Sequence, residues 1–368
     1  MAGLPYSRRD FVAQVASLAA TAPAAARPWA QTASPGSITD VAGLRAGHYT
    51  DPRRPTGCTV LLFDEPVTAG ADYNGSAPGE SLGVMLQPVS PVDRIHGILL
   101  TGGGPMGLDA VGGVVRFLEQ RGVGYDWGIP NVRIPIVVGA VIDDLSLGDG
   151  RIRPGQEEAI RACLAASVAP LEEGNVGVGH GATIGKMLRG RGLPGMKGGV
   201  GTCSARFGDL VVAALAVANA AGDVVDWRSG RLLAGARTTD GRALADTGEV
   251  LRRGLSTNPQ AGGVPVADAA FRATTISVVA TNLRLDKTRL TKLAMMANTG
   301  ASRAVRPYHT EGDGDQVLAV ATGAVERPVP LTTVGAIAAD LVADAIVRAV
   351  RAATSLGEWT AVRDLGAV

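Results

Sequence analysis

Short runs of aliphatic and β-branched residues are interspersed in irregular order with helix-like segments, and this order constrains the fold more than any other feature. Such runs are typical of strands, whereas apolar residues recurring every three to four positions indicate helices. A strict alternation of strand and helix would predict a parallel sheet, and the chain does not show one. We therefore expect an α+β fold in which helices pack on sheets. The predicted strands are residues 58–63, 94–100, 135–142 and 209–217, and the predicted helices are residues 108–120, 156–166, 287–296 and 334–353, the last capped by Thr332 or Thr333.

The composition excludes several classes of function. The 50 glycines are spread along the chain, which indicates many tight turns and not a disordered tract. Lys and Arg (35) balance Asp and Glu (34), so we expect no basic field that attracts nucleic acid. Cys58, Cys163 and Cys203 form no CxxC pair and are predicted to be small buried apolar residues. No histidines lie at a metal-ligand spacing, and we expect neither a metal nor an organic cofactor.

Residues 1–37 are predicted to be an export signal and a linker. Ser7-Arg8-Arg9-Asp10-Phe11 is a twin-arginine pattern, an Ala-rich run follows it, and Ala24-Ala25-Ala26 offers a cleavage site for a signal peptidase. This predicts export of the folded protein to the periplasm or the cell exterior. An ordinary amphipathic first helix is the alternative. No later run reaches about 18 apolar residues, so we expect no association with a membrane through a spanning helix.

Two glycine-rich motifs suggest chemistry that their context does not favour. Residues 79–83 match the G-x-S-x-G elbow of serine hydrolases, but a loop-like composition precedes them where an elbow needs a strand. Residues 102–107 match G-x-G-x-x-G between a predicted strand and a predicted helix. There, Pro105 interrupts the amides that would face a phosphate, and no acidic residue ends a second strand at the expected distance. A tight turn is favoured, and a non-catalytic nucleotide-binding protein remains the alternative.

A sharper signal lies in two segments near the C-terminal quarter of the chain. Residues 273–282 are a β-rich run that starts with hydroxyl residues, beginning at Thr274. Further on, Asp313 and Asp315 flank a glycine, and in an extended segment both carboxylates would face the same way. Taken separately, these segments are an unremarkable strand and an acidic turn.

Together with motifs elsewhere, these segments resemble the self-processing L-aminopeptidase/D-Ala-esterase/amidase family, which includes β-peptidyl aminopeptidases. The resemblance spans nearly all of residues 38–353 and is strongest to the nylon-oligomer endo-hydrolase branch, which has a Thr nucleophile. The motifs that carry it are Gly102-Gly103-Gly104, Ala140-Val141-Ile142, Gly185-Lys186, Met196-Lys197-Gly198-Gly199-Val200-Gly201, Ala218-Asn219, Thr274-Thr275-Ile276-Ser277, His309-Thr310 and Asp313-Gly314-Asp315.

The resemblance implies a four-layer αββα sandwich of the N-terminal-nucleophile-hydrolase type. It also implies autocleavage between Ala273 and Thr274, which would divide one hydrolase domain into a large fragment (38–273) and a small fragment (274–368). The family commonly forms homotetramers or larger homo-oligomers. Two positions depart from the family pattern. Ala273 stands where Gly or Asn is common, which leads us to expect slow or partial cleavage. Asp143 stands where characterised relatives have a Tyr.

The resemblance also implies a role for each site residue. Thr274 would be the nucleophile, with its freed α-amine (pKa about 7.7–8.0) as the base. Asp313 and Asp315 would hold the amine and hydroxyl in place. Asn219 would donate to the developing oxyanion, and Lys186 would lie beside the nucleophile.

The function expected from these roles is hydrolysis of amide bonds in short peptides or in 6-aminohexanoate (nylon) oligomers. Asp143 and Asp144 would add carboxylates near the site, and Asp143 would bind a substrate ammonium group. The alternatives on the same fold are an aminopeptidase or β-aminopeptidase and an acyltransferase.

Overall fold

The computed structural model describes residues 36–257 and 273–365, which belong to one compact unit. The predicted export signal and linker therefore lie outside the described residues, except for residues 36 and 37. The α-helices are α2 (Val111–Glu119), α3 (Gln156–Ala165), α4 (Thr247–Thr257), α6 (Lys287–Ala304) and α7 (Leu331–Ala352). The strands are β1 (Leu44–Thr50), β2 (Gly57–Asp72), β3 (Glu80–Ser81), β4 (Arg94–Thr101), β5 (Val137–Val141), β6 (Thr183–Ile184), β7 (Met196–Lys197), β8 (Gly199–Phe207), β9 (Leu210–Asn219), β10 (Asp223–Val225), β11 (Leu232–Ala234), β12 (Thr274–Leu283), β13 (Val305–Arg306) and β14 (Gln316–Val325).

Strand β2 is the element that connects the two β-layers. The strands follow the order β3-β5-β4-β2-β14-β12-β9-β8, and β1 also pairs with β2. The first half of β2 pairs with β1 and β4, whereas its last residues, Thr68–Asp72, pair with β14. The register between β2 and β4 shifts between Leu62 and Val67. Because its two halves pair with different partners, β2 belongs to both layers.

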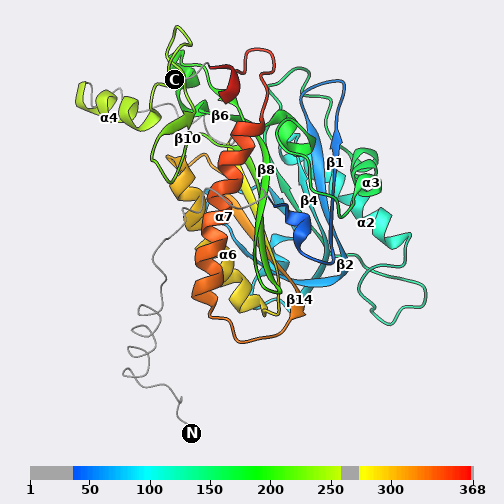
Figure 1. The fold of residues 1–368 in the computed structure, drawn as a ribbon. Coiled ribbons are helices and arrows are strands. Elements are labelled where there is room, and N and C mark those ends of the chain that lie inside the picture. The colour runs from blue at the N-terminus through cyan, green and yellow to red at the C-terminus, as the bar shows by residue number, and fades with distance from the viewer. Residues whose placement is uncertain (1–35, 258–272, 366–368) are drawn as a thin grey trace, which may run out of the picture. The chain divides into compact units, whose positions relative to one another are not determined.

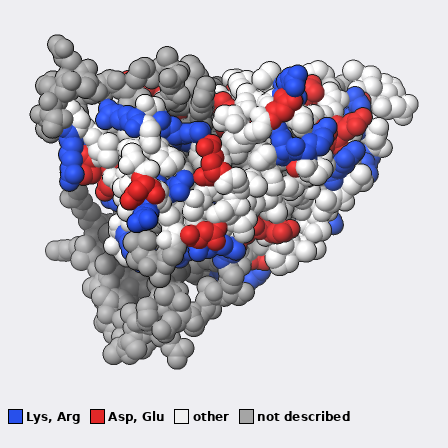
Figure 2. All heavy atoms as spheres, turned by 90° about the horizontal axis from the view of Figure 1, so that it is seen from above, with Lys and Arg blue, Asp and Glu red and all other residues white. Residues whose placement is uncertain are grey.

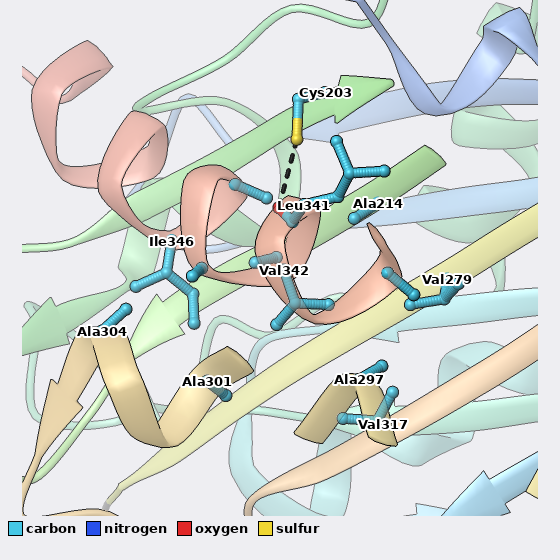
Figure 3. Close-up of a cluster of buried hydrophobic side chains, with 14 of the residues drawn as sticks. Cys203, Ala214, Val279, Ala297, Ala301, Ala304, Val317, Leu341, Val342 and Ile346 are labelled. Carbon is cyan, nitrogen blue, oxygen red and sulfur yellow. Dashed lines mark hydrogen bonds between the residues drawn. The ribbon is translucent and has the colours of Figure 1, made fainter. Parts of the chain in front are cut away.

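Alternation of side chains along β9 shows how the layers pack, because successive residues of a strand point to opposite faces. The odd-numbered residues from Val211 to Val217 join a buried cluster with apolar residues of β1, β2, β4 and β5. The even-numbered residues from Val212 to Ala218 join a second cluster with α6 and α7. Figure 3 shows part of this second cluster, where the Cys203 thiol also donates to Leu341 O at 3.1 Å. Strand β9 is thus covered by a sheet on one face and by helices on the other.

Helices α2 and α3 cover the outer face of the other β-layer. A third buried cluster joins them to Val60, Leu62, Leu99 and Val137, which come from β2, β4 and β5. In Figure 1, α6 and α7 lie on one side of the strands and α2 and α3 on the other. The order of layers is therefore helix, sheet, sheet, helix, and the predicted αββα sandwich is confirmed.

The predicted elements are found, with differences at their ends. Helix α7 begins at Leu331 after Pro330, and no side chain caps it, so the predicted Thr cap is wrong. Helix α6 continues to Ala304, eight residues beyond the predicted end at 296, and its N-cap Asp286 accepts from Arg289 N at 2.8 Å. The three cysteines are buried and free, as predicted.

The surface carries charges of both signs. On the face shown in Figure 2, Lys and Arg side chains alternate with Asp and Glu. Several of these charges are paired, for example Arg303 with Asp340 at 2.8 Å. Exposed pairs of this kind contribute at most about 1 kcal/mol each. Among the described residues, no helix combines the length and the apolar character needed to cross a membrane.

Candidate active site

Thr274 is the first residue of β12, in the middle of the sheet. Strand β12 lies between β9 and β14, and Thr274 is paired directly with Asn219, the last residue of β9. Even-numbered residues of β12, such as Ile276, join the cluster between the two β-layers, so the Thr274 side chain faces this side. Thr274 is only 6% exposed. The hydroxyl group of Thr274 therefore lies at the edge of the buried space between the two β-layers.

The carbonyl oxygen of Ala273 accepts two hydrogen bonds. Thr274 Oγ1 donates to it at 2.6 Å, and the backbone N–H of Gly314 donates to it at 2.9 Å. Ala273 also forms a parallel bridge with Asp313. The peptide bond between Ala273 and Thr274 is thus held beside a hydroxyl and an amide donor.

The turn Asp313-Gly314-Asp315 leads directly into β14 and is held by its backbone. Gly75 N donates to Asp315 O and Ala77 N donates to Asp313 O, each at 3.0 Å. A Cβ on Gly314 would lie 2.6 Å from Ala77 O and 2.8 Å from Thr274 Oγ1. Position 314 therefore has no room for a side chain, which explains the glycine between the two aspartates.

The two carboxylates of this turn have different surroundings. Asp315 Oδ1 accepts from Thr275 N at 2.6 Å, and Asp315 Oδ2 accepts from His309 N at 3.1 Å. Asp313 Oδ2 accepts from both the backbone N–H (2.8 Å) and the hydroxyl (2.6 Å) of Thr310, whereas its Oδ1 is buried without a partner. Burial, and then the charge of Asp315, raise the pKa of Asp313 to about 6. Asp313 can therefore exchange a proton near neutral pH.

Asn219 presents a buried hydrogen-bond donor. Its Oδ1 accepts from Thr183 N at 3.0 Å and from Lys186 Nζ at 2.8 Å. Two donors at the same atom fix the orientation of the amide, because the flipped amide would place its own N–H groups against them. Asn219 Nδ2 is then left buried with no partner. Such a donor is suited to stabilise an oxyanion.

Lys186 lies close to the carboxylates of the site. Burial lowers the pKa of its amine to about 7, and Asp143, Asp313, Asp144 and Asp315 oppose this shift in that order. The ammonium and neutral amine forms are therefore both populated near neutral pH. Lys186 can change its protonation state under the same conditions as Asp313.

The structure places Asp143 and Asp144 in different environments. Asp143 lies just after β5, is half-buried, and accepts from Leu145 N at 2.9 Å. Asp144 is fully buried: it pairs with Arg54 and accepts from Thr56 Oγ1 at 2.6 Å and from Gly103 N at 2.9 Å. Both oxygens of Asp144 are engaged inside the protein, so it holds the fold at this point and does not face a ligand.

The site residues predicted from the sequence thus come together, although both carboxylate oxygens of Asp144 are already bonded within the protein. Thr274, Asn219, Lys186, Asp313 and Asp315 are joined by direct contacts or share one group of charges. Sequence reasoning missed Thr183 N, which orients Asn219, because a backbone donor has no signature in the sequence. It also missed Arg54, which lies 90 residues before its partner Asp144.

The two glycine-rich motifs have structural explanations. Ser81 ends the two-residue strand β3, and a 3-10 helix follows, so the segment lacks the strand-to-helix context of an elbow. In the second motif, Gly103 N donates to Asp144 Oδ1 and Gly104 N donates to Ile142 O at 3.0 Å. A Cβ on Gly107 would lie 1.9 Å from Gly102 O. These glycines form a tight turn whose amides are already used.

Taken together, the site offers a hydroxyl, an unpaired acceptor, an unpaired donor and an amine that titrates near neutral pH. These are the parts needed for nucleophilic attack on a carbonyl carbon: a nucleophile, groups that can take up its proton, and a donor for the oxyanion. The same end of β12 carries further buried polar atoms that make no hydrogen bond, including Thr275 Oγ1, Gln316 Oε1 and His309 Nδ1, the last of which lies 3.5 Å from Asp315 Oδ2.

Comparison with known proteins gives consistent results. Residues 36–361 match peptidase family S58. An uncharacterised aminopeptidase of Mycobacterium tuberculosis is 38% identical over 359 residues, which cover 89% of this chain and 97% of that protein. A 6-aminohexanoate-oligomer endohydrolase of Kocuria sp. is 30% identical, with 85% of each chain covered.

Solved structures share the fold at lower identity. A β-aminopeptidase of Burkholderia sp. superposes with a TM-score of 0.61 at 23% identity and covers 88% of this chain and 90% of its own. An L-aminopeptidase D-Ala-esterase/amidase of Ochrobactrum anthropi, described as a variant of the Ntn hydrolase fold, superposes with a TM-score of 0.60 at 24% identity, with 88% of each chain covered.

Proposed function

The chain belongs to peptidase family S58 and hydrolyses peptide or amide bonds, and we propose that Thr274 becomes its nucleophile through self-cleavage of the Ala273–Thr274 bond. The observation that carries the proposal is the position of Ala273 O, which accepts from Thr274 Oγ1 at 2.6 Å and from Gly314 N at 2.9 Å. The bond to be cut therefore lies against its nucleophile, with a backbone donor already directed at the oxygen that becomes the oxyanion.

In the proposed self-cleavage, Thr274 Oγ1 attacks the carbonyl carbon of Ala273 and transfers its proton to Asp313. The negative charge that develops on Ala273 O is stabilised by Gly314 N–H. The C–N bond then breaks, the Thr274 nitrogen takes up the proton, and an ester joins Ala273 to the Thr274 hydroxyl. Water hydrolyses this ester, leaving a carboxylate on Ala273 and a free α-amine on Thr274. Asp313 suits the role of base because its pKa is raised to about 6.

Hydrolysis of a substrate repeats this chemistry with a different base. The free α-amine, whose pKa is about 7.7–8.0 in an ordinary chain, takes the proton of Thr274 Oγ1 as it attacks the substrate carbonyl. Asn219 Nδ2 donates to the oxyanion. The amine then protonates the leaving nitrogen, and water releases the acyl group from Thr274. Asp315 keeps the start of β12 in place through Thr275 N.

The substrates proposed are short peptides or 6-aminohexanoate oligomers, in line with the names of the relatives. Asp143 would bind the ammonium group of a substrate with a free N-terminus, which would give aminopeptidase character. The Asp143→Asn variant tests this: it should lose activity on a free-amine substrate more than on its N-acetylated form. Equal losses on both would remove Asp143 from substrate binding.

Replacement of Thr274 tests the central proposal. Wild-type protein analysed by intact mass should give two fragments that meet between Ala273 and Thr274. Thr274→Ala should give one uncut chain without hydrolase activity, because no hydroxyl is left to attack. Thr274→Ser keeps the hydroxyl and should still be cut. A single chain of wild-type protein with full activity, or an active Thr274→Ala variant, would contradict the mechanism.

The proposal also covers the export and the assembly of the enzyme. Residues 1–37 would direct the folded chain through the twin-arginine route to the periplasm or the medium, and the enzyme would assemble into a homotetramer or a larger homo-oligomer. Cell fractionation with an Arg8→Lys/Arg9→Lys variant as control tests the first statement. Light scattering of the purified enzyme tests the second. Retention of the wild-type protein in the cytoplasm, or a monomer in solution, would contradict them.

A further inference from the structure

Lys197 is a fully buried lysine, at 0% exposure, in the two-residue strand β7. Its Nζ donates to the carbonyl oxygens of Gly179 (2.9 Å), Ala182 (2.8 Å) and Gly198 (3.2 Å). Burial lowers the pKa of its amine to about 7. Burying a charged side chain costs desolvation free energy, which hydrogen bonds of this kind offset only in part. A buried lysine at this position is therefore expected to have a structural or functional role.

The carbonyl groups that Lys197 contacts do not all depend on it. Ala182 O also accepts from Gly198 N at 2.9 Å, and Gly179 O also accepts from Ala182 N at 3.2 Å. Satisfying these two oxygens therefore does not explain the lysine. What Lys197 adds is a cross-link, because it ties the segment 179–182 to the start of the chain segment that enters β8.

This cross-link lies next to the residue that orients Asn219. Thr183 follows Ala182 directly, is paired with Lys197 across β6 and β7, and donates its N–H to Asn219 Oδ1 at 3.0 Å. The other end of the cross-link also lies beside Asn219, since a Cβ on Gly198 would approach Ala218 O to 2.0 Å. Lys197 therefore fixes the backbone on both sides of the amide.

We infer that Lys197 is a positioning residue for the oxyanion donor: it holds Thr183 N against Asn219 Oδ1, so that Asn219 Nδ2 faces the reacting carbonyl. The inference rests on the proposed function, because it assumes that Asn219 Nδ2 stabilises the oxyanion. Displacement of a catalytic group by about 1 Å lowers rates by up to about 100-fold. Loss of this alignment should therefore reduce kcat and leave substrate binding nearly unchanged.

A double-mutant cycle between Lys197 and Asn219 tests the inference. Initial rates on linear 6-aminohexanoate trimer and on an amino-acid p-nitroanilide are normalised to the mature fragment that starts at Thr274. Lys197→Met should lower kcat about 10- to 100-fold with KM changed by less than about 2-fold. In an Asn219→Ala background, where there is no amide left to orient, Lys197→Met should lower kcat by less than about 2-fold further.

Lys287 supplies the matched control. Its Nζ also donates to three carbonyl oxygens, those of Met85 (2.8 Å), Ser90 (3.2 Å) and Val92 (2.8 Å), whereas Asn219 Oδ1 is bonded by Thr183 and Lys186, which lie in a different segment. Lys287→Met should leave kcat within about 2-fold of wild type. If Lys197→Met yields no soluble mature enzyme, Lys197→Gln takes its place in the cycle, because it keeps two of the donor hydrogens on a neutral side chain.

The outcomes separate this inference from the proposed function. Equal losses of kcat from Lys197→Met in both backgrounds, or no loss in either, would overturn the positioning role while Asn219→Ala still lowers kcat. If Asn219→Ala itself leaves kcat unchanged, Asn219 is not the oxyanion donor, and the proposed function of the site fails together with the inference.

Discussion

At the scale of single residues, the site contains buried polar atoms that make no hydrogen bond although they belong to an amide and a carboxylate. Asn219 Nδ2 and Asp313 Oδ1 are both buried and make no hydrogen bond. An unsatisfied buried group costs about 1–3 kcal/mol of stability. In the transition state, Asn219 Nδ2 can donate to the oxyanion and Asp313 Oδ1 can accept a proton. Both groups then form hydrogen bonds that they lack in the resting protein, so the site binds the transition state more tightly than the ground state.

The raised pKa of Asp313 should make the free energy of unfolding depend on pH. Its pKa is raised from 3.8 to about 6, so the folded chain holds a proton that the unfolded chain releases between these pH values. The contribution of Asp313 to stability is therefore complete below about pH 4 and is lost as the pH rises through about 6. The uncut Thr274→Ala protein should thus lose about 2 kcal/mol between pH 4 and 7 relative to Thr274→Ala/Asp313→Asn.

Urea denaturation of both proteins across this pH range measures the difference. The shared Thr274→Ala background keeps the chain intact, so self-cleavage does not contribute to the result. A difference in the free energy of unfolding that stays constant, or grows in favour of Asp313 with rising pH, would show that the pKa of this carboxyl is not raised.

At the scale of elements, α6 and α7 approach each other closely at Gly300. A Cβ on Gly300 would lie 1.9 Å from Ala339 O, which belongs to the backbone of α7. Alanines at 297, 301 and 304 continue the same narrow contact, part of which Figure 3 shows. The small side chains therefore allow the two helices to pack closely together, as the layer that covers β9, β12 and β14.

Gly300→Ala separates this packing effect from helix propensity. Propensity alone predicts that Ala stabilises the helix interior by about 1 kcal/mol over Gly. The structure predicts the opposite sign, a loss of about 1–3 kcal/mol, because the new methyl group forces the helices apart. Gly248→Ala in α4 is the control, since its Cβ would meet only side-chain atoms at van der Waals distance, Arg252 Nη1 at 3.4 Å and Asp246 Oδ1 at 3.5 Å. Thermal unfolding that shows both variants equally stable would contradict the close packing.

The positions of most helices and strands could be predicted from the sequence, whereas the ends of helices and the pairing of strands could be predicted less well. The run at 58–63 was found as the first half of β2, but the pairing of Thr68–Asp72 with β14 depends on a strand about 250 positions later. The end of α6 was missed because polar residues near 303 interrupt its apolar pattern. Likewise, Thr274 and its two aspartates could be inferred from spacing and resemblance. The ion pair of Asp144 and the bonds of Lys197 depend on tertiary contacts that no local pattern encodes.

At the scale of the whole molecule, the proposed cut between Ala273 and Thr274 separates two fragments whose strands and helices pack together in one domain. Strand β12 starts at Thr274 and lies between β14, from the same proposed fragment, and β9, from the other. Helices α6 and α7 follow the cut in sequence and cover strands that precede it, including β9. The two proposed fragments therefore share one sheet and two buried clusters, so separating them would expose the core to water.

We accordingly expect the two fragments to remain together after self-cleavage. They should co-elute in native size-exclusion chromatography, separate only under denaturing conditions, and unfold in one cooperative calorimetric transition. The uncut Thr274→Ala protein is the reference, and it should elute at the same volume, because the cut breaks one bond without removing a packed element. Elution of a free fragment from residue 274 onward without denaturant, or two separate transitions in the cleaved enzyme only, would show that the sandwich depends on the covalent bond at 273–274.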